Sequence, residues 1–172
     1  MGMDVFGKKP INEAGQYFRN NIWWWYPLAA FLVETYPKVT SKCKDWHTNS
    51  GYGLGAKASR DLAKLVKADI RSGKVKDFER AQQLALAALP PVACTYCDAT
   101  GIRTDQLGLE DKFPERPLSP EVVKLTGRTH GWCNGCDGLG TTQSFQALFC
   151  FSVSNVEEFS NFLENCGGFN IY

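Results

Sequence analysis

Two Cys-x-x-Cys pairs constrain the fold of this chain more than any other feature. The first lies in CTYCDATG, residues 94–101, and the second in CNGCDGLG, residues 133–140. Two residues between the cysteines let both thiolates reach one ion from a tight turn, whose backbone N–H groups can donate to the sulfurs. Two such turns complete a tetrahedral set of four thiolates, which favours Zn²⁺. The sequence therefore predicts one zinc ion, bound by Cys94, Cys97, Cys133 and Cys136.

We expect this zinc to be structural, because four cysteines fill the tetrahedron and leave no position for a water molecule. A single pair could equally be a redox dithiol, but two pairs, each followed by Asp and a nearby Gly, favour metal binding. The seven cysteines and the absence of a recognisable secretory signal favour a reducing, cytoplasmic location. Two further interpretations stay open: a second metal site at Cys43 and His47, completed by Cys150 or Cys166, and His130 as an exchangeable ligand.

The longest apolar run gives no reason to expect a membrane partner. It extends from Ile22 to Val33 and contains Pro27. Crossing a bilayer takes about 20 apolar residues, so this run is too short. We interpret it as a buried helix of a soluble protein.

Apolar periodicity and capping residues predict the order of the secondary structure. Strands are expected at residues 3–7, 145–153 and 169–172, and a loop at 45–55. Helices are expected at residues 21–35, 57–72, 77–89, 120–126 and 155–165. Asn20 or Asn21 would cap the first helix, and Ser154 with Glu157 would form a capping box for the last. The second and third helices are expected to form an antiparallel hairpin.

These elements predict an α+β fold, with a mainly helical body, a small β-sheet and a four-cysteine zinc-knuckle subdomain. The expected divisions are a helical body with a basic helix at 1–91, a zinc-knuckle insertion at 92–142, and a C-terminal strand and helix at 143–172. The C-terminal part is expected to pack back on the body, so that the chain forms a single compact unit.

Six basic residues are spaced alternately three and four apart, and so form a stripe along one side of the helix predicted at 57–72. Such a stripe can follow phosphates or dock on an acidic partner. A solvated helix face is nevertheless the favoured interpretation, because Asp61 and Asp69 flank the stripe and weaken its positive field. The stripe consists of Lys57, Arg60, Lys64, Lys67, Arg71 and Lys74.

The run Trp23, Trp24, Trp25 and Tyr26 is the second candidate for a binding surface. Successive helical residues point about 100° apart, so these rings cannot all face one way. Some of them must enter the core. A purely structural role in the core is the favoured interpretation, and Trp23 or Trp24 as an exposed anchor for a partner is the alternative.

The two cysteine motifs resemble the CxxCxGxG repeats of the zinc region of DnaJ chaperones. The match is close in residues 133–140, whereas Ala99 replaces a Gly of the pattern in residues 94–101. DnaJ proteins have four repeats and two zinc ions, and their J-domain motif His-Pro-Asp is absent here. The resemblance implies zinc ligation by the four cysteines and does not imply co-chaperone activity.

Longer stretches resemble small proteins of tailed bacteriophages and prophages. They are DVFGKKPINEAGQYFRNNIWWW, WHTNSGYGLG, TGRTHGWCNGC and FSVSNVEEFSNFLENCGGF. This resemblance implies a phage origin and a place in the host cytoplasm. Proteins of this kind often bind a host protein, including components of antiviral defence.

The first functional hypothesis is therefore a non-enzymatic, zinc-stabilised interaction protein of phage type that binds a host protein, possibly as an inhibitor of antiviral defence. A nucleic-acid-binding accessory protein that uses residues 57–74 is the alternative. A small metal-dependent or redox enzyme is the second alternative. The chain contains no Walker loop or dinucleotide fingerprint, and no catalytic triad has a recognisable signature.

Overall fold

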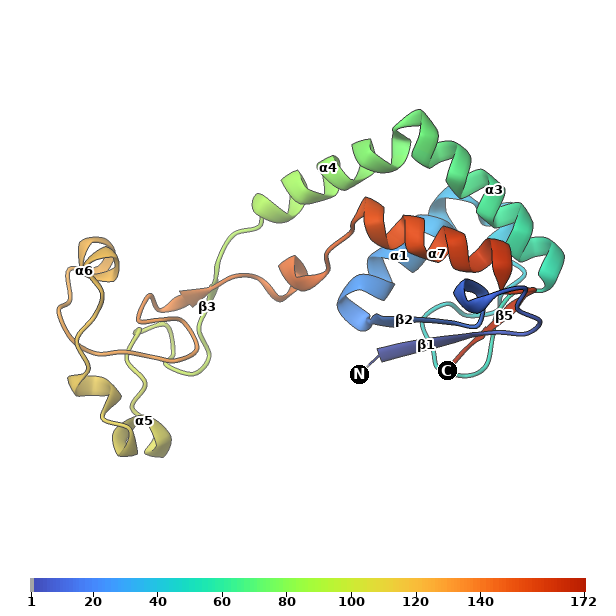
Figure 1. The fold of residues 1–172 in the computed structure, drawn as a ribbon. Helices are drawn as coiled ribbons and strands as arrows, with labels where there is room; N and C mark the ends of the chain where they lie inside the picture. Colours follow the sequence, from blue (N-terminus) through green and yellow to red (C-terminus); the bar gives the residue numbers. More distant parts are fainter. Residues whose placement is uncertain (1) are drawn as a thin grey trace. The chain divides into compact units, whose positions relative to one another are not determined.

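The structure is a computed structural model that describes residues 2–172, and it divides the chain into two compact units. The main unit comprises the chain through Ala87 together with Leu148–Tyr172, and the knuckle unit comprises Ala88–Ala147. The boundaries expected from the sequence were 92 and 142, within one compact unit. Figure 1 shows the elements of both units.

The main unit is an α+β structure with more helix than strand, as predicted. Its β-sheet contains three antiparallel strands in the order β2-β1-β5. Strand β1 is central, because Val5 is paired with Phe18 of β2 and with Ile171 of β5. In chain order the elements are β1 (Gly2–Gly7), the 3-10 helix η1 (Glu13–Gly15), β2 (Tyr17–Asn21), α1 (Ile22–Thr35), α2 (Pro37–Thr40), α3 (Ala56–Ser72), α4 (Lys74–Ala87), α7 (Val153–Asn165) and β5 (Phe169–Ile171).

The predictions of strands at 3–7 and 169–172 are confirmed, but β2 was not predicted. Its two buried side chains are the apolar Phe18 and the polar Asn20, so β2 lacks the apolar residue at every second position that usually indicates a strand. Asn20 is buried and donates a hydrogen bond from Nδ2 to Oδ1 of Asn155, at 2.7 Å. This bond satisfies a polar group that would otherwise be costly to bury.

Helix α1 lies in the core, as predicted. The side chain of Asn21 accepts a hydrogen bond from the backbone N–H of Trp24, which confirms one of the two predicted caps. Trp25, Leu28 and Leu32 are completely buried. The indole N–H of Trp25 donates to the backbone carbonyl of Trp46 at 2.6 Å, so a loop residue satisfies the polar end of the largest buried ring.

The loop predicted at 45–55 is confirmed, and it covers the outer edge of the sheet. The backbone N–H groups of Phe169 and Ile171 donate to the carbonyls of Leu54 and Tyr52, at 2.9 and 2.8 Å. Gly53 has no room for a side chain, because a Cβ atom there would lie 1.9 Å from the carbonyl oxygen of Phe169. The close approach of the two backbones therefore requires glycine.

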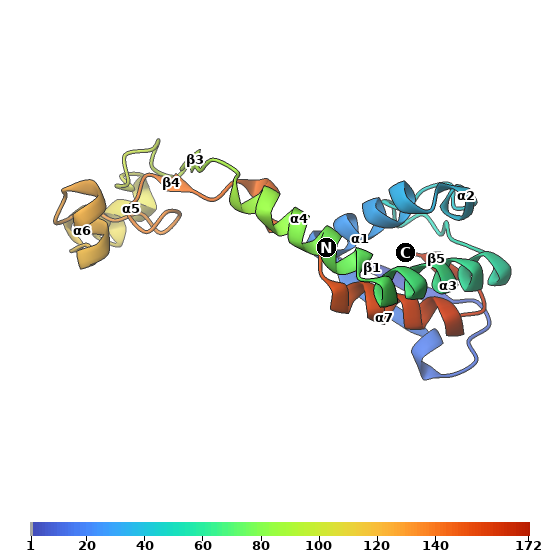
Figure 2. The ribbon, with the colours of Figure 1, turned by 90° about the horizontal axis from the view of Figure 1, so that it is seen from above.

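The two helices α3 and α4 are present, but the predicted antiparallel hairpin is wrong. Helix α4 continues away from α3 instead of folding back along it (Figures 1 and 2). Only Gly73 separates the two helices, and its left-handed backbone, with a φ of 87°, ends α3 without a loop long enough for a reversal. The first half of α4 is anchored by Phe78, which packs against Phe31 and Phe151.

The predicted strand at 145–153 is also wrong. Phe145–Leu148 forms a 3-10 helix, η3, and Val153 already belongs to α7. The alternating apolar residues serve different units: Ala147 is buried in the knuckle unit and Phe151 in the core of the main unit. A chain segment that passes between two units can alternate in this way without forming a strand.

The cap of α7 lies two residues before the predicted one. The Oγ of Ser152 accepts a hydrogen bond from the backbone N–H of Asn155, at 3.2 Å. Ser154 lies inside the first turn instead, so the capping box predicted for Ser154 and Glu157 is wrong. The carboxylate of Glu79 in α4 adds a second cap by accepting the N–H of Val153, at 3.0 Å.

None of the helices in the described part of the chain is long and apolar enough to span a bilayer.

We expect Ser152→Ala to lower the free energy of unfolding of the main unit by about 1 kcal/mol, because it removes the cap of α7. Ser154→Ala is the matched control and should change it by less than about 0.5 kcal/mol. Urea denaturation followed by Trp fluorescence measures both. A larger loss in the Ser154 variant would contradict the observed cap.

Candidate metal centre

Short strands and turns bring the two cysteine motifs together in the knuckle unit. Strand β3 (Val92–Ala93) pairs antiparallel with β4 (Thr141–Thr142). The backbone N–H of Cys94 extends this pairing by donating to the carbonyl of Gly140, at 2.9 Å. The turns that carry the motifs, which we call the knuckles (residues 94–101 and 133–140), therefore leave the same two-stranded ladder side by side.

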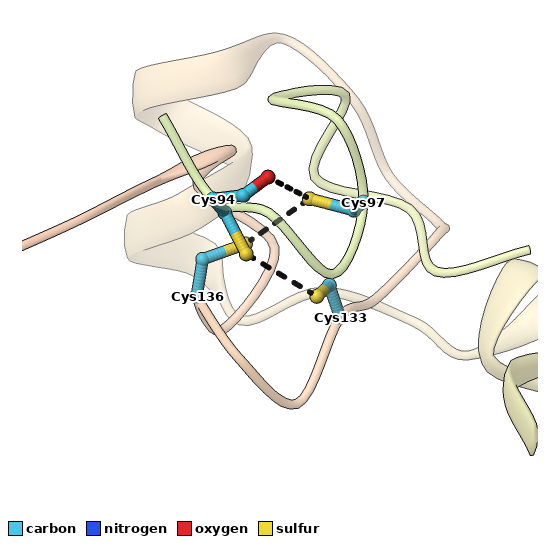
Figure 3. A group of neighbouring side chains, drawn as sticks. All are labelled: Cys94, Cys97, Cys133 and Cys136. Carbon is cyan, nitrogen blue, oxygen red and sulfur yellow. Dashed lines mark hydrogen bonds between the residues drawn. The ribbon is translucent and has the colours of Figure 1, made fainter. Parts of the chain in front are cut away.

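The four cysteine sulfurs form a compact, buried cluster (Figure 3). All lie within 4.8 Å of one another, and the Cys94–Cys133 and Cys97–Cys136 sulfurs are 3.8 and 3.7 Å apart. A zinc–sulfur bond of about 2.3 Å gives a tetrahedron with edges of about 3.8 Å. The four residues are between 0 and 6% exposed. They are the only group of three or more Cys, His, Asp or Glu residues within residues 2–172 that is close enough to hold an ion.

Backbone N–H groups donate to the sulfurs in the same pattern in both knuckles. The second cysteine of each accepts the N–H of the glycine four residues later: Gly101 donates to Cys97 and Gly140 to Cys136, both at 3.2 Å. The first cysteine accepts the N–H two residues later, from Gly135 to Cys133 at 3.4 Å and from Tyr96 to Cys94. These donors stabilise thiolates, which are the form that binds metals.

Burial and hydrogen bonding act against each other on the thiol pKa values. For Cys94 burial opposes ionisation, but the Tyr96 N–H and the neighbouring thiols outweigh it and lower the pKa. For Cys133 burial is the larger effect and raises the pKa, and for Cys136 it raises the pKa to about 12. The raised pKa values of Cys133 and Cys136 mean that these two thiols hold their protons more tightly than a free cysteine, and a metal ion must displace those protons to bind.

Left-handed backbone at equivalent positions shapes both knuckles. Asp98 and Ala99 have φ values of 46° and 63°, and Asp137 and Gly138 have φ values of 50° and 85°. Glycine is favoured at 138 by its φ, and a Cβ atom there would lie 2.6 Å from Cδ2 of Leu118, whose side chain would have to move. Ala99 adopts the same conformation with a side chain, which costs about 1 kcal/mol. The departure of residues 94–101 from the DnaJ pattern thus leaves a strained residue in the first knuckle.

Two arginines donate hydrogen bonds to the second knuckle, and neither was predicted from the sequence. Arg103 donates to the carboxylate of Asp105 at 2.8–3.0 Å and to Oδ1 of Asn134 in the second knuckle at 2.7 Å. Arg128 donates to the carbonyls of Gly131, at 3.1 Å, and Gly138. The bond from Arg103 to Asn134 spans 31 residues of sequence and the bond from Arg128 to Gly138 spans ten, and only the folded structure identifies them.

The segment between the knuckles folds over a small aromatic cluster. Phe113 is buried and packs edge-to-face on Trp132, at 4.9 Å between ring centres, while the Arg116 guanidinium lies 3.8 Å from the Trp132 ring centre. The segment contains the helices α5 (Gln106–Glu110) and α6 (Pro120–Thr126) and the 3-10 helix η2 (Phe113–Glu115). Helix α6 has the predicted bounds, with Ser119 as its cap and Gly127 at its end.

The predicted basic stripe lies along α3 in the main unit, but half of its charges are paired. Lys57 pairs with Asp61 of the same helix, Lys67 with Glu164 of α7, and Lys74 of α4 with Asp69. The remaining three, Arg60, Lys64 and Arg71, make no ion pair within the described residues.

The three tryptophans of α1 have different environments. Trp25 is buried, Trp24 is 36% exposed, and Trp23 is half-buried against Phe149, with ring centres 5.0 Å apart. Trp24 is therefore the ring of this run that is most available to a partner.

Cys43 and His47 line one pocket, but within residues 2–172 they do not join a third possible ligand to form a metal-type cluster. The Cys43 thiol is buried and donates to the carbonyl of Asp45, at 3.2 Å, while the His47 ring packs on Tyr26. His130 is exposed, and its Nδ1 lies 3.0 Å from Oγ1 of Thr129. Neither histidine belongs to a metal-type cluster among residues 2–172.

No protein-family model, curated protein or solved structure matches this chain.

We expect Ala99→Gly to tighten metal binding by about two- to fivefold, because it relieves the left-handed strain at a net gain of about 0.5–1 kcal/mol. Gly138→Ala is the matched reverse change and should weaken binding by at least a similar factor. Competition with a chelator measures both affinities. Weaker binding by the Ala99 variant would show that residue 99 is not strained.

Proposed function

We propose that this chain is a zinc-stabilised interaction protein of phage type, without enzymatic activity, that binds a host protein. The observation that carries this proposal is the buried cluster of four thiols, at separations suited to a tetrahedral ion. Four thiolates are the set preferred by Zn²⁺, and they leave it no open position for a substrate. The ion would therefore stabilise a surface rather than perform chemistry.

The surface of the knuckle unit supports a role in binding. A small unit built around a metal has little interior, and here several large apolar side chains remain exposed. Exposed aromatic and aliphatic residues are typical anchors of protein interfaces. They are Val92, Tyr96, Leu107, Leu109, Leu125, Leu139 and Phe145.

The nature of the partner follows from the phage resemblance. A small phage protein acts in the cytoplasm of its host, and a component of antiviral defence is the partner that we favour. The ion pairs along α3 argue against the nucleic-acid alternative, because Lys57, Lys67 and Lys74 already have carboxylate partners. A phosphate backbone would have to displace those partners.

Purified protein should contain about one zinc ion per chain, and Cys133→Ser or Cys136→Ser should abolish that content and unfold the knuckle unit. Cys150→Ser is the control, because Cys150 lies outside the cluster, and it should retain the zinc. Elemental analysis and amide hydrogen exchange measure the two effects. A metal-free protein with a protected knuckle unit would contradict the zinc assignment.

The partner is tested by capture from host cells that express the tagged chain. We expect a host protein to remain bound after nuclease treatment. We also expect Leu109→Asp with Leu125→Asp, two exposed substitutions that leave the cysteines intact, to weaken its capture at least tenfold. Glu substitutions of Arg60 and Lys64, two cations of α3 that make no ion pair within residues 2–172, are the comparison. Capture that nuclease treatment abolishes, or that falls only in the Glu variants in a salt-dependent way, would favour nucleic-acid binding.

A further inference from the structure

A pocket of about 270 Å³ lies between α3 and α7 of the main unit. Lys67, Ile70 and Arg71 line it from α3, and Glu157 and Ser160 line it from α7. The spacings are three and four residues on α3 and three on α7, so each helix presents one face to the pocket. The ion pair between Lys67 and Glu164 joins the two helices beside it.

An unpartnered hydroxyl group marks this pocket as a site for a polar ligand. Ser160 is 1% exposed, and its Oγ has no hydrogen-bond partner. A buried hydroxyl without a partner costs free energy, and most such groups in folded proteins are satisfied. A ligand that accepts a hydrogen bond in the pocket would remove this cost.

The cations of the pocket fit an oxyanion. Arg71 makes no ion pair within residues 2–172, so its guanidinium is available for a two-point contact. Lys67 supplies a second positive charge and is only partly engaged, since its partner Glu164 is half-exposed to water. Together with the Ser160 hydroxyl, these groups offer donors from both helices.

The acidic residues decide which oxyanion fits. Glu157 lines the same pocket, and Glu164 pairs with Lys67. Two basic and two acidic groups give a net charge of zero, so a dianion such as phosphate gains little, whereas a single negative charge can lie against Arg71 at less cost. We propose that this pocket binds one carboxylate group, presented by an acidic side chain or by the C-terminus of a protein partner.

This inference rests on the proposed function only in assigning the carboxylate to a protein. The pocket itself can be tested with small molecules on the full-length protein, without any partner. Failure to capture a host protein would therefore not contradict the carboxylate site. Failure to detect the carboxylate site would not contradict the proposal of a zinc-stabilised interaction protein.

The experiment is a titration of isotope-labelled protein at constant ionic strength, followed by NMR. The probes are sodium acetate, N-acetylglutamate α-amide for a side-chain carboxylate, N-acetylalanine for a C-terminal carboxylate, and inorganic phosphate. We expect saturable shifts of the Arg71 Nε–H and Ser160 amide signals, with millimolar dissociation constants for acetate and for at least one of the two acetylated probes. The tighter of those two probes identifies the source.

Three variants give the result its specificity. Arg71→Gln should weaken acetate binding at least about tenfold, and Ser160→Ala about threefold or more. Arg60→Gln is the matched control, since Arg60 is an exposed, unpaired cation of the same helix outside the pocket, and it should leave binding unchanged. Ser160→Ala should not lower the urea midpoint, because no hydrogen bond is lost.

Three outcomes would overturn the proposal. One is the absence of saturation by any carboxylate up to about 50 mM, well above the millimolar range expected of a single charged contact. Another is tighter binding of phosphate than of acetate. The third is an equal loss of binding in the Arg60 and Arg71 variants, which would show that carboxylates are attracted by the overall positive charge of α3 and not by the pocket.

Discussion

The convergence of four thiols on one point is the interaction on which the knuckle unit depends. The paired sulfurs are 39 residues apart in sequence, and the intervening segment has only a small aromatic cluster of its own. A unit of this size buries too little apolar surface to be stable without additional links. The two-residue ladder between β3 and β4 aligns the knuckles, and an ion bound by the thiolates would hold them together.

The main unit depends on a different principle, the burial of large rings between a small sheet and α1, α3 and α7. Trp25 and Phe159 are completely buried in this core, and the indole N–H of Trp25 is satisfied by a loop carbonyl. Such a core needs no metal. We therefore expect loss of the ion to affect the two units very differently, which separates the stability of the knuckle unit from that of the rest of the chain.

The basic side chains along α3 differ in whether a carboxylate of the same chain pairs with them. Lys57, Lys67 and Lys74 are held by carboxylates of their own chain, and the pKa of Asp61 is lowered mainly by its hydrogen bond from Lys57. Arg71 remains unpaired beside the buried hydroxyl of Ser160. The six basic residues are evenly spaced in sequence, but in the structure some are paired with carboxylates and others are not. The part of the stripe best suited to a specific ligand is the pocket between α3 and α7.

The sequence by itself determined the features that are local. The turn within each Cys-x-x-Cys pair, the cap at Asn21 and the helix ends at Gly73 and Gly127 depend on residues a few positions apart, and the structure contains all of them. Tertiary structure decided what depends on distant partners. The polar strand β2 forms because β1 pairs with it. Ser152 rather than Ser154 caps α7 because the helix begins at Val153. The α3–α7 pocket forms where two helices that are 80 or more residues apart in sequence meet. No periodicity within one segment can report such contacts, because the free energy that fixes them comes from groups elsewhere in the chain.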